Sequence, residues 1–176
     1  MLAGALRTVS AEVAEGRRTP AEERVVVSTA WRLVARLGGQ FPHRGRKRGE
    51  VVLASPPGEH HGLPLALVAN LLRYAGLRVV ELGTDTPAAD VLDALGRSQD
   101  LVAVGIGVTT VERLPAAREL IATVRGVHPS LPLLLGGQAV RNPEIAELAG
   151  ATAWSAGPDL VAQIDRLLAL PRLSTA

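Results

Sequence analysis

Two periodicities of apolar residues divide the chain. Up to about residue 40, apolar positions recur at helical spacing, whereas from residue 51 short runs of β-branched residues and leucines alternate with helical stretches. Alternation of this kind is typical of a parallel sheet, because parallel strands are joined by crossover helices. The pattern therefore predicts a helical unit followed by an α/β unit.

The α/β unit is predicted to contain five strands and five helices. A proline stands near the start of each helix, where its fixed φ and missing donor do least harm. Elements in this order favour a flavodoxin-like, doubly wound, five-stranded parallel sheet. The predicted strands cover 51–55, 78–82, 101–106, 132–135 and 151–154, and the predicted helices cover 63–75, 87–97, 114–126, 142–149 and 158–169.

The first forty residues are predicted to form a short cap of two helices. Thr19-Pro20 marks the start of the second helix, and Gly38-Gly39 is predicted to end it. Two helices cannot bury their apolar stripe alone, so we expect the cap to pack on the α/β domain or on a second copy of the chain. The stripe consists of Val26, Ala30, Val34 and Leu37, with Trp31 beside it in an expected core position.

The composition sets the size of the core and the compartment. A chain of 176 residues that is 47% hydrophobic can bury one full-sized core and a small accessory element. The absence of cysteine excludes disulfides, zinc–thiolate sites and iron–sulfur clusters, and the cytoplasm is the expected location. Neither a signal peptide nor a membrane span is expected. We predict a helical cap over 1–40, a basic linker over 41–50, the α/β domain over 51–170 and a tail over 171–176.

The charge gives little support for nucleic-acid binding. The formal net charge is +2, which is close to balanced. One basic cluster spans residues 43–48 and could contact phosphate, but a short basic run with glycine is more typical of a solvated linker. We expect no direct DNA binding and no helix-turn-helix domain ahead of the cap.

Candidate chemistry lies at the carboxyl ends of the strands, where ligands of open α/β sheets bind. Three predicted loops there are polar or rich in glycine: 56–62, 107–110 and 136–138. In the first of them, Glu59 could accept the ring N–H of His61 and leave the other nitrogen free for a metal. The alternative is a solvated loop histidine, with glycines that only relieve crowding at the strand ends.

Residues 51–157 resemble the cobalamin-binding domain family. Its mark is an Asp-x-His-x-x-Gly loop after the first strand, small or hydroxyl residues after the third and Gly-Gly after the fourth. Glu59 and His61 match the acidic residue and the histidine. The run PPGEHHGLPLALVANLLRYAGLRVVELGTDTP is most similar to light-responsive MerR-type repressors and their short stand-alone relatives, in which glutamate commonly replaces the aspartate.

The resemblance implies cobalamin as the cofactor, with its adenosyl, methyl and hydroxo forms not distinguished. It implies that His61 is the lower axial ligand of cobalt, displacing the cofactor's own dimethylbenzimidazole, and that Glu59 supports the histidine. It further implies cofactor contacts by His60, Gly62, Leu63, Gly107, Thr109, Thr110, Gly136, Gly137 and Gln138 in the sheet domain and by Val13 and Glu23 in the cap.

The chain departs from the family pattern at several positions. Pro64 replaces the motif glycine, and Gly107 stands where serine is common, although Thr109 and Thr110 could replace that hydroxyl. In the cap, Val13 and Arg24 take the places of a tryptophan and a histidine, and only the glutamate, Glu23, is kept. The family's cap has four helices, whereas two are predicted here.

Three classes of function follow. The leading one is a non-enzymatic cobalamin-binding regulator of transcription, with a photoreceptor as one form of it, whose cap contacts a protein partner or forms a homo-oligomer. The second is the corrinoid carrier subunit of a methyltransferase system. The third is a degenerate domain kept for protein contact. A phosphoacceptor receiver is disfavoured because no acidic cluster follows the first strand, and a flavin site because the first loop lacks a phosphate cradle.

Overall fold

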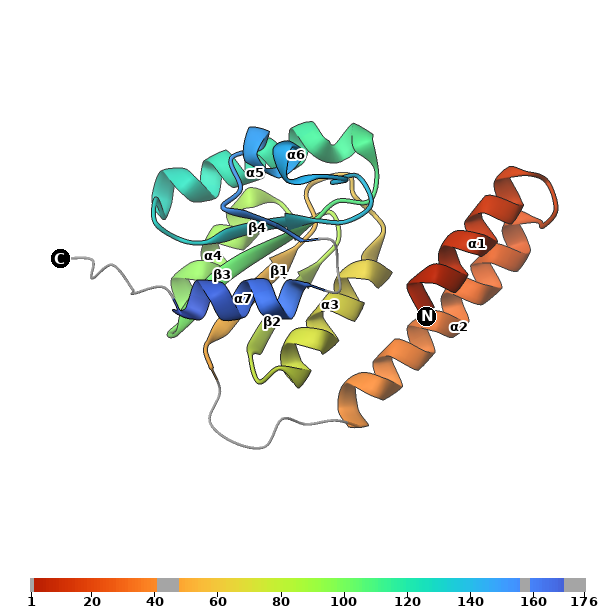
Figure 1. Cartoon of the computed structure of the whole chain (residues 1–176), viewed down its shortest axis with the longest axis horizontal. Coiled ribbons are helices and arrows are strands. Elements are labelled where there is room, and N and C mark those ends of the chain that lie inside the picture. The colour runs from red at the N-terminus through yellow and green to blue at the C-terminus, as the bar shows by residue number, and fades with distance from the viewer. Residues whose placement is uncertain (1, 41–47, 156–158, 170–176) are drawn as a thin grey trace. The chain divides into compact units, whose positions relative to one another are not determined.

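The structure is a computed structural model that describes residues 2–40, 48–155 and 159–169. Its contacts divide the chain into one unit from Met1 to Pro42 and a second from His43 to Ala176, and each is described by itself (Figure 1). Residues 43–47 of the basic cluster and the tail from 170 lie outside the described residues. No described helix combines the length and the apolar character needed to cross a membrane.

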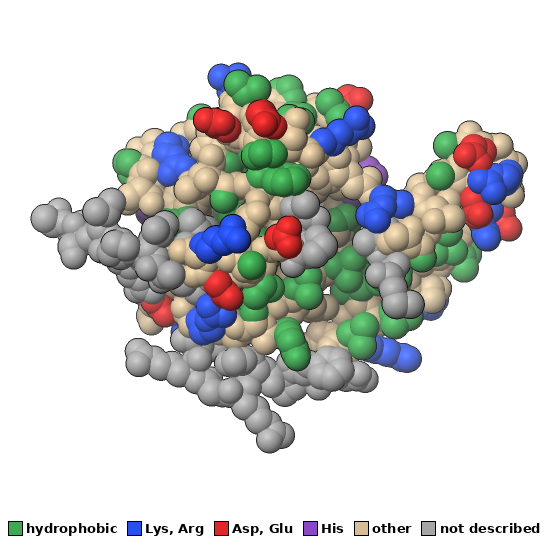
Figure 2. Space-filling view, in the orientation of Figure 1, with side chains coloured by type: hydrophobic (Ala, Val, Ile, Leu, Met, Phe, Trp, Pro, Cys, Tyr) green, Lys and Arg blue, Asp and Glu red, His purple; other side chains and the backbone are tan. Residues whose placement is uncertain are grey.

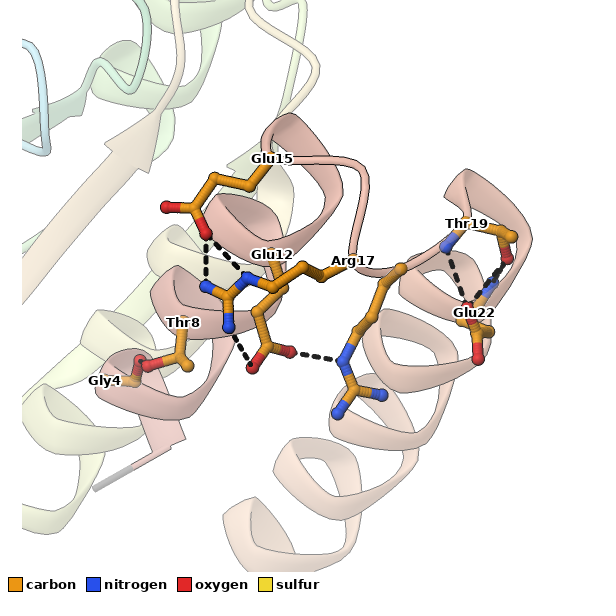
Figure 3. Close-up of polar contacts among 8 residues, drawn as sticks. Gly4, Thr8, Glu12, Glu15, Arg17, Thr19 and Glu22 are labelled. Atoms are coloured by element: carbon orange, nitrogen blue, oxygen red, sulfur yellow. Dashed lines mark hydrogen bonds and ion pairs between the residues drawn. The ribbon is translucent and has the colours of Figure 1, made fainter.

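The first unit is a helical hairpin of α1 (Leu2–Ala14) and α2 (Pro20–Gln40). The turn between them is held by ion pairs of Arg17 with Glu15 and of Arg18 with Glu12, and α2 begins with a capping box (Figure 3). In that box Glu22 N–H donates to Thr19 Oγ1 at 3.2 Å, and Thr19 N–H donates to the Glu22 carboxylate at 2.8 Å.

Three predictions for this hairpin are wrong. The second helix does not end at Gly38-Gly39 but continues to Gln40, so the glycines are tolerated inside its last turn. Trp31 is not a core residue, because it is 41% exposed, whereas Ala30 and Val34 of the predicted stripe are buried. Leu37, which was also predicted to belong to the stripe, is 43% exposed. The stripe is thus centred on Ala30 and Val34, and Trp31 flanks it.

The second unit is a five-stranded parallel sheet with the strand order β2-β1-β3-β4-β5. Figure 1 labels the strands β1 to β4 of this sheet. The predicted doubly wound, flavodoxin-like fold is confirmed. The strands are β1 (Glu50–Ala54), β2 (Arg78–Gly83), β3 (Leu101–Gly107), β4 (Leu133–Gly136) and β5 (Ala153–Ser155). The helices are α3 (Gly62–Tyr74), α4 (Ala88–Arg97), a short 3₁₀ turn η1 (Val111–Arg113), α5 (Leu114–Val127), α6 (Pro143–Leu148) and α7 (Leu160–Ala169).

The sheet is buried on both faces. Alternate strand residues point to opposite sides, so Val52 and Val104 pack with α4, α5 and α6, whereas Val51 and Leu53 pack with α3 and α7. Acidic and basic side chains are interspersed over the visible outer surface (Figure 2). Because all five strands are parallel, their carboxyl ends meet at one edge, and the loops that follow them are neighbours there.

Candidate functional site

The side chain of Glu59 is the centre of the candidate site. It follows β1 and is 1% exposed, yet both of its carboxylate oxygens have donors. Oε1 accepts the backbone N–H of His61 at 3.0 Å and lies 2.6 Å from His61 Nδ1. Oε2 accepts the backbone N–H groups of Thr109 at 2.7 Å and Thr110 at 3.1 Å, with Thr110 Oγ1 at 3.4 Å. One carboxylate thus joins the loops that follow β1 and β3.

These hydrogen-bond donors determine the protonation state of the Glu59 carboxyl. Burial by itself would raise the pKa of this carboxyl. The hydrogen bonds from Thr109, from His61 and from Thr110 outweigh the burial, and the pKa lies below its usual value. Glu59 is therefore a buried anion at neutral pH, held by hydrogen bonds to its charged form.

His61 is oriented by that anion. The ring can donate to the carboxylate only from a protonated Nδ1, so the geometry assigns the proton of the neutral ring to Nδ1 and the lone pair to Nε2. The side chain is 57% exposed, and the residue caps the N-terminus of α3. An accessible imidazole with one nitrogen anchored on a carboxylate is the arrangement of a metal ligand.

The glycines after β3 and β4 have structural reasons of their own. Gly137 has φ +112°, and a Cβ there would lie 2.1 Å from the carbonyl oxygen of Val108. At Gly136 a Cβ would lie 2.9 Å from the Ser155 carbonyl oxygen, and at Gly107 it would lie 3.1 Å from Leu65 Cδ1. Close backbone contacts therefore explain Gly136 and Gly137 without a ligand, whereas a Cβ at Gly107 would meet only the flexible end of the Leu65 side chain.

The other predicted site residues are spread more widely. In the described part of the chain, the side chain of His60 is exposed and makes no hydrogen bond, and Gln138 is also exposed. Leu63 is buried on α3, directly after Gly62. In the hairpin, Val13 lies on α1 and the Glu23 carboxylate accepts from Ser10 Oγ at 2.5 Å. Contact of these residues with a cofactor stays a prediction.

Two residues at this edge were not predicted. The Asp85 carboxylate, after β2, accepts the N–H of Gly58 at 2.7 Å, and the Arg113 guanidinium covers Gly58 so closely that a Cβ there would lie 2.6 Å from Nη1. The rule that ligands bind beyond the carboxyl ends of strands also covers the loop after β2. The polar run Gly83-Thr84-Asp85-Thr86 could therefore have predicted that the loop after β2 takes part in the site.

The metal-binding side chains at this edge fit a metal ion that is coordinated mainly by its own cofactor. Among the described residues no group of three or more His, Cys, Asp or Glu side chains could hold a metal ion. One accessible imidazole nitrogen, by contrast, is what a metal inside a macrocycle takes from a protein as an axial ligand. The residues present therefore fit a corrinoid cofactor.

Fold and site together define a protein that presents an exposed imidazole, paired with a buried carboxylate, at the carboxyl edge of a doubly wound sheet. Residues 49–161 match the family described as the B12 binding domain, which covers more than half of the chain and all of the loops above. The chain belongs to this family, as its resemblance predicted, and cobalamin is the cofactor that this membership indicates.

Related proteins of known sequence include two that carry the same domain within longer chains. The methanol–corrinoid protein of Methanosarcina barkeri is 29% identical over 104 residues, which are 59% of this chain and 40% of that protein. Methionine synthase of Mycobacterium leprae is 34% identical over 99 residues, which are 55% of this chain and 8% of that protein. The chain thus spans less than half the length of either relative.

Solved structures share the fold. A cobalamin-binding protein of Desulfitobacterium hafniense DCB-2 superposes with a TM-score of 0.62 at 25% identity, covering 69% of this chain and 59% of the other. The monomethylamine corrinoid protein of Methanosarcina barkeri gives a TM-score of 0.75 at 17% identity, covering 93% and 78% respectively. At that identity the second match shows the fold alone.

Proposed function

We propose that the chain holds cobalamin at the carboxyl edge of its sheet, with His61 Nε2 as the lower axial ligand of cobalt. The observation that carries this proposal is the 2.6 Å contact between His61 Nδ1 and the buried Glu59 carboxylate, which leaves Nε2 accessible. When bound, cobalamin supplies a cobalt centre that can carry an exchangeable upper ligand. Glu59 keeps the proton of His61 on Nδ1 and fixes the orientation of the ring, so that the lone pair of Nε2 is free for a metal.

The loops around His61 would hold the remainder of the cofactor. Gly62 and Leu63 begin α3, and all of the remaining predicted residues border the same edge: Gly107 ends β3, with Thr109 and Thr110 in the loop after it, and Gly136 ends β4, with Gly137 and Gln138 after it. Thr109 and Thr110 supply backbone N–H groups to the Glu59 carboxylate, and the Thr110 hydroxyl lies 3.4 Å from the same oxygen. We also keep His60, Val13 and Glu23 as proposed contacts.

Among the uses of a bound corrinoid, the relatives favour a methyl-carrier subunit over a regulator. The names of the two sequence relatives are methanol–corrinoid protein and methionine synthase. A structure similar at 22% identity is titled a methanol:cobalamin methyltransferase complex. A carrier would dock on a methyltransferase, and the exposed apolar residues of α2 are a candidate contact for a partner or a second copy.

The second candidate is a regulatory role in the cytoplasm, with light as the proposed signal. Its support is the loop run after β1, which is similar to that of light-responsive repressors. The two roles differ in a measurable way. A carrier should lose the methyl group of bound methylcobalamin to a methyl acceptor in the presence of a methyltransferase. A photoreceptor should change its spectrum and its oligomeric state on illumination.

The ligand assignment is tested with His61→Ala and, as the matched control, His60→Ala. Both variants lose one imidazole from the same loop. After reconstitution with hydroxocobalamin, His60→Ala should keep the visible spectrum of histidine-ligated cobalt, whereas His61→Ala should lose it. An unchanged spectrum in His61→Ala, or its loss in His60→Ala alone, would contradict the assignment.

A further inference from the structure

Asp85 has an unusual backbone conformation. It lies in the loop between β2 and α4 and has φ +52°. Every other described residue with a positive φ is a glycine. Aspartate enters this left-handed region more readily than most residues, because its short side chain forms local hydrogen bonds. The side chain is exposed, so the residue contributes nothing to the core.

The contacts of Asp85 are with the loop that carries the histidine. Its Oδ1 accepts the N–H of Gly58 at 2.7 Å, and its own N–H donates to the carbonyl oxygen of Glu59 at 2.9 Å. A third bond, from Thr86 N–H to the Ser55 carbonyl oxygen at 3.0 Å, continues the connection toward β1. Residues 55–59 are thereby held by the loop after β2.

Glu59 is therefore fixed at both ends. Asp85 holds its backbone from the β2 side, and Thr109 and Thr110 hold its carboxylate from the β3 side. The carboxylate can reach His61 Nδ1 at 2.6 Å only while the backbone of residues 58 and 59 stays in place. If Asp85 served its own loop alone, its carboxylate would accept from residues of that loop rather than from Gly58.

We infer that Asp85 is a positioning residue for His61: by fixing the backbone of Gly58 and Glu59, it keeps the imidazole proton on Nδ1 and Nε2 directed outward. The use of that nitrogen by cobalt rests on the proposed function. The positioning itself concerns atoms of this chain and can be measured without a cofactor.

Three substitutions separate the backbone conformation of Asp85 from its hydrogen bond. Asp85→Gly keeps access to positive φ but removes the acceptor. Asp85→Asn keeps both the acceptor oxygen and a tolerance of positive φ, so it is the conservative rescue. Asp93→Ala removes an exposed carboxylate from the following helix, where it pairs with Arg97, and serves as the matched control.

The first measurement uses the full chain without cofactor. ¹⁵N spectra of the His61 ring at a pH where it is neutral should show the Nδ1–H tautomer in the wild type, Asp85→Asn and Asp93→Ala. In Asp85→Gly the Nδ1–H population should fall, and exchange of the Gly58 amide should speed up about tenfold or more, the factor associated with a lost hydrogen bond to a charged group. If Asp85→Gly kept the wild-type tautomer of the His61 ring and the wild-type exchange rate of the Gly58 amide, the inference would be overturned.

The second measurement adds hydroxocobalamin, reduced to Co(II), to ¹⁵N-labelled protein. The splitting of the electron paramagnetic resonance by ¹⁵N of a ligating histidine differs from that by the ¹⁴N base of the cofactor. The ¹⁵N-ligated fraction should fall in Asp85→Gly and return in Asp85→Asn; an equal fraction in the wild type and Asp85→Gly would count against Asp85. If the wild type and His61→Ala gave the same spectrum, the proposed function would fail, and the ring tautomer would still decide on Asp85.

Discussion

At the scale of single residues, Glu59 has the largest expected effect on stability. In Glu59→Gln one carboxylate oxygen becomes an NH₂ group, which must face an N–H donor of His61 or of Thr109. Replacing an acceptor by a donor in a buried site leaves groups unsatisfied, which should lower the free energy of unfolding by about 2–4 kcal/mol. Urea titration followed by circular dichroism measures the change. Glu119→Gln, at an exposed position on α5, should change it by less than about 0.5 kcal/mol.

The same carboxyl predicts a dependence of stability on pH. The pKa of Glu59 is lower in the folded chain than its usual value, so the folded state binds its proton less tightly than the unfolded state. The stabilisation is complete above the usual glutamate pKa of about 4.3 and is lost as the pH falls through the lower, folded-state value. The difference in unfolding free energy between wild type and Glu59→Gln should therefore shrink in acid below about pH 4. A difference that stays constant from neutral pH into that range would contradict this.

Gly137 is the residue at which backbone geometry allows no side chain. In Gly137→Ala the added Cβ would meet the Val108 carbonyl oxygen at 2.1 Å, at a φ of +112° that alanine disfavours. We expect a loss of more than about 2 kcal/mol in the free energy of unfolding, because backbone on both sides must move. Gly126→Ala on α5 meets nothing within 4 Å and should be neutral or stabilising by up to about 1 kcal/mol. Equal unfolding midpoints for the two variants would show that the β4 loop can relax.

At the scale of elements, the start of α2 depends on its capping box. Thr19→Ala removes the hydroxyl that accepts the Glu22 N–H at 3.2 Å, and it should destabilise the first turn by about 1 kcal/mol. Hydrogen exchange of the amides at residues 21–23 should accelerate. Thr8→Ala is the control, since the Thr8 hydroxyl only donates to the Gly4 carbonyl oxygen within α1 (Figure 3). Faster exchange of the α2 amides in Thr8→Ala would mean that the hairpin opens as a whole.

Element order was predictable, whereas contacts between loops were not. Apolar runs separated by helical stretches fix the sequence of strands and helices, and parallel connection then restricts the strand order to few topologies. Glu59 and His61 were predictable because two residues in an extended segment share a side. The contact of Thr109 depends on β1 and β3 being neighbours, and that of Asp85 depends on its left-handed φ. Local periodicity predicts neither of these features. Trp31 was misassigned because helical spacing gives the direction of a stripe but not its width.

At the scale of the whole molecule, the two units provide separate reporters of their own unfolding. The chain has two tryptophans, and one lies in each unit: Trp31 in the hairpin and Trp154 on β5, where its Nε1 donates to the Val140 carbonyl oxygen at 2.8 Å. Trp154→Phe leaves fluorescence from the hairpin, and Trp31→Phe leaves fluorescence from the sheet. Each variant therefore follows a different unit in the same full-length chain.

We expect the hairpin to unfold first. Ala30 and Val34 are the apolar residues that its described part buries, and short helices without a larger packed face are marginally stable in water. The sheet unit, by contrast, has apolar clusters on both faces. In urea, the fluorescence transition of Trp154→Phe should therefore come at a lower concentration than that of Trp31→Phe. Circular dichroism of both variants against the wild type controls for the hydrogen bond that Trp154→Phe removes. Coincident transitions in the two variants would show instead that the hairpin and the sheet form one cooperative folding unit.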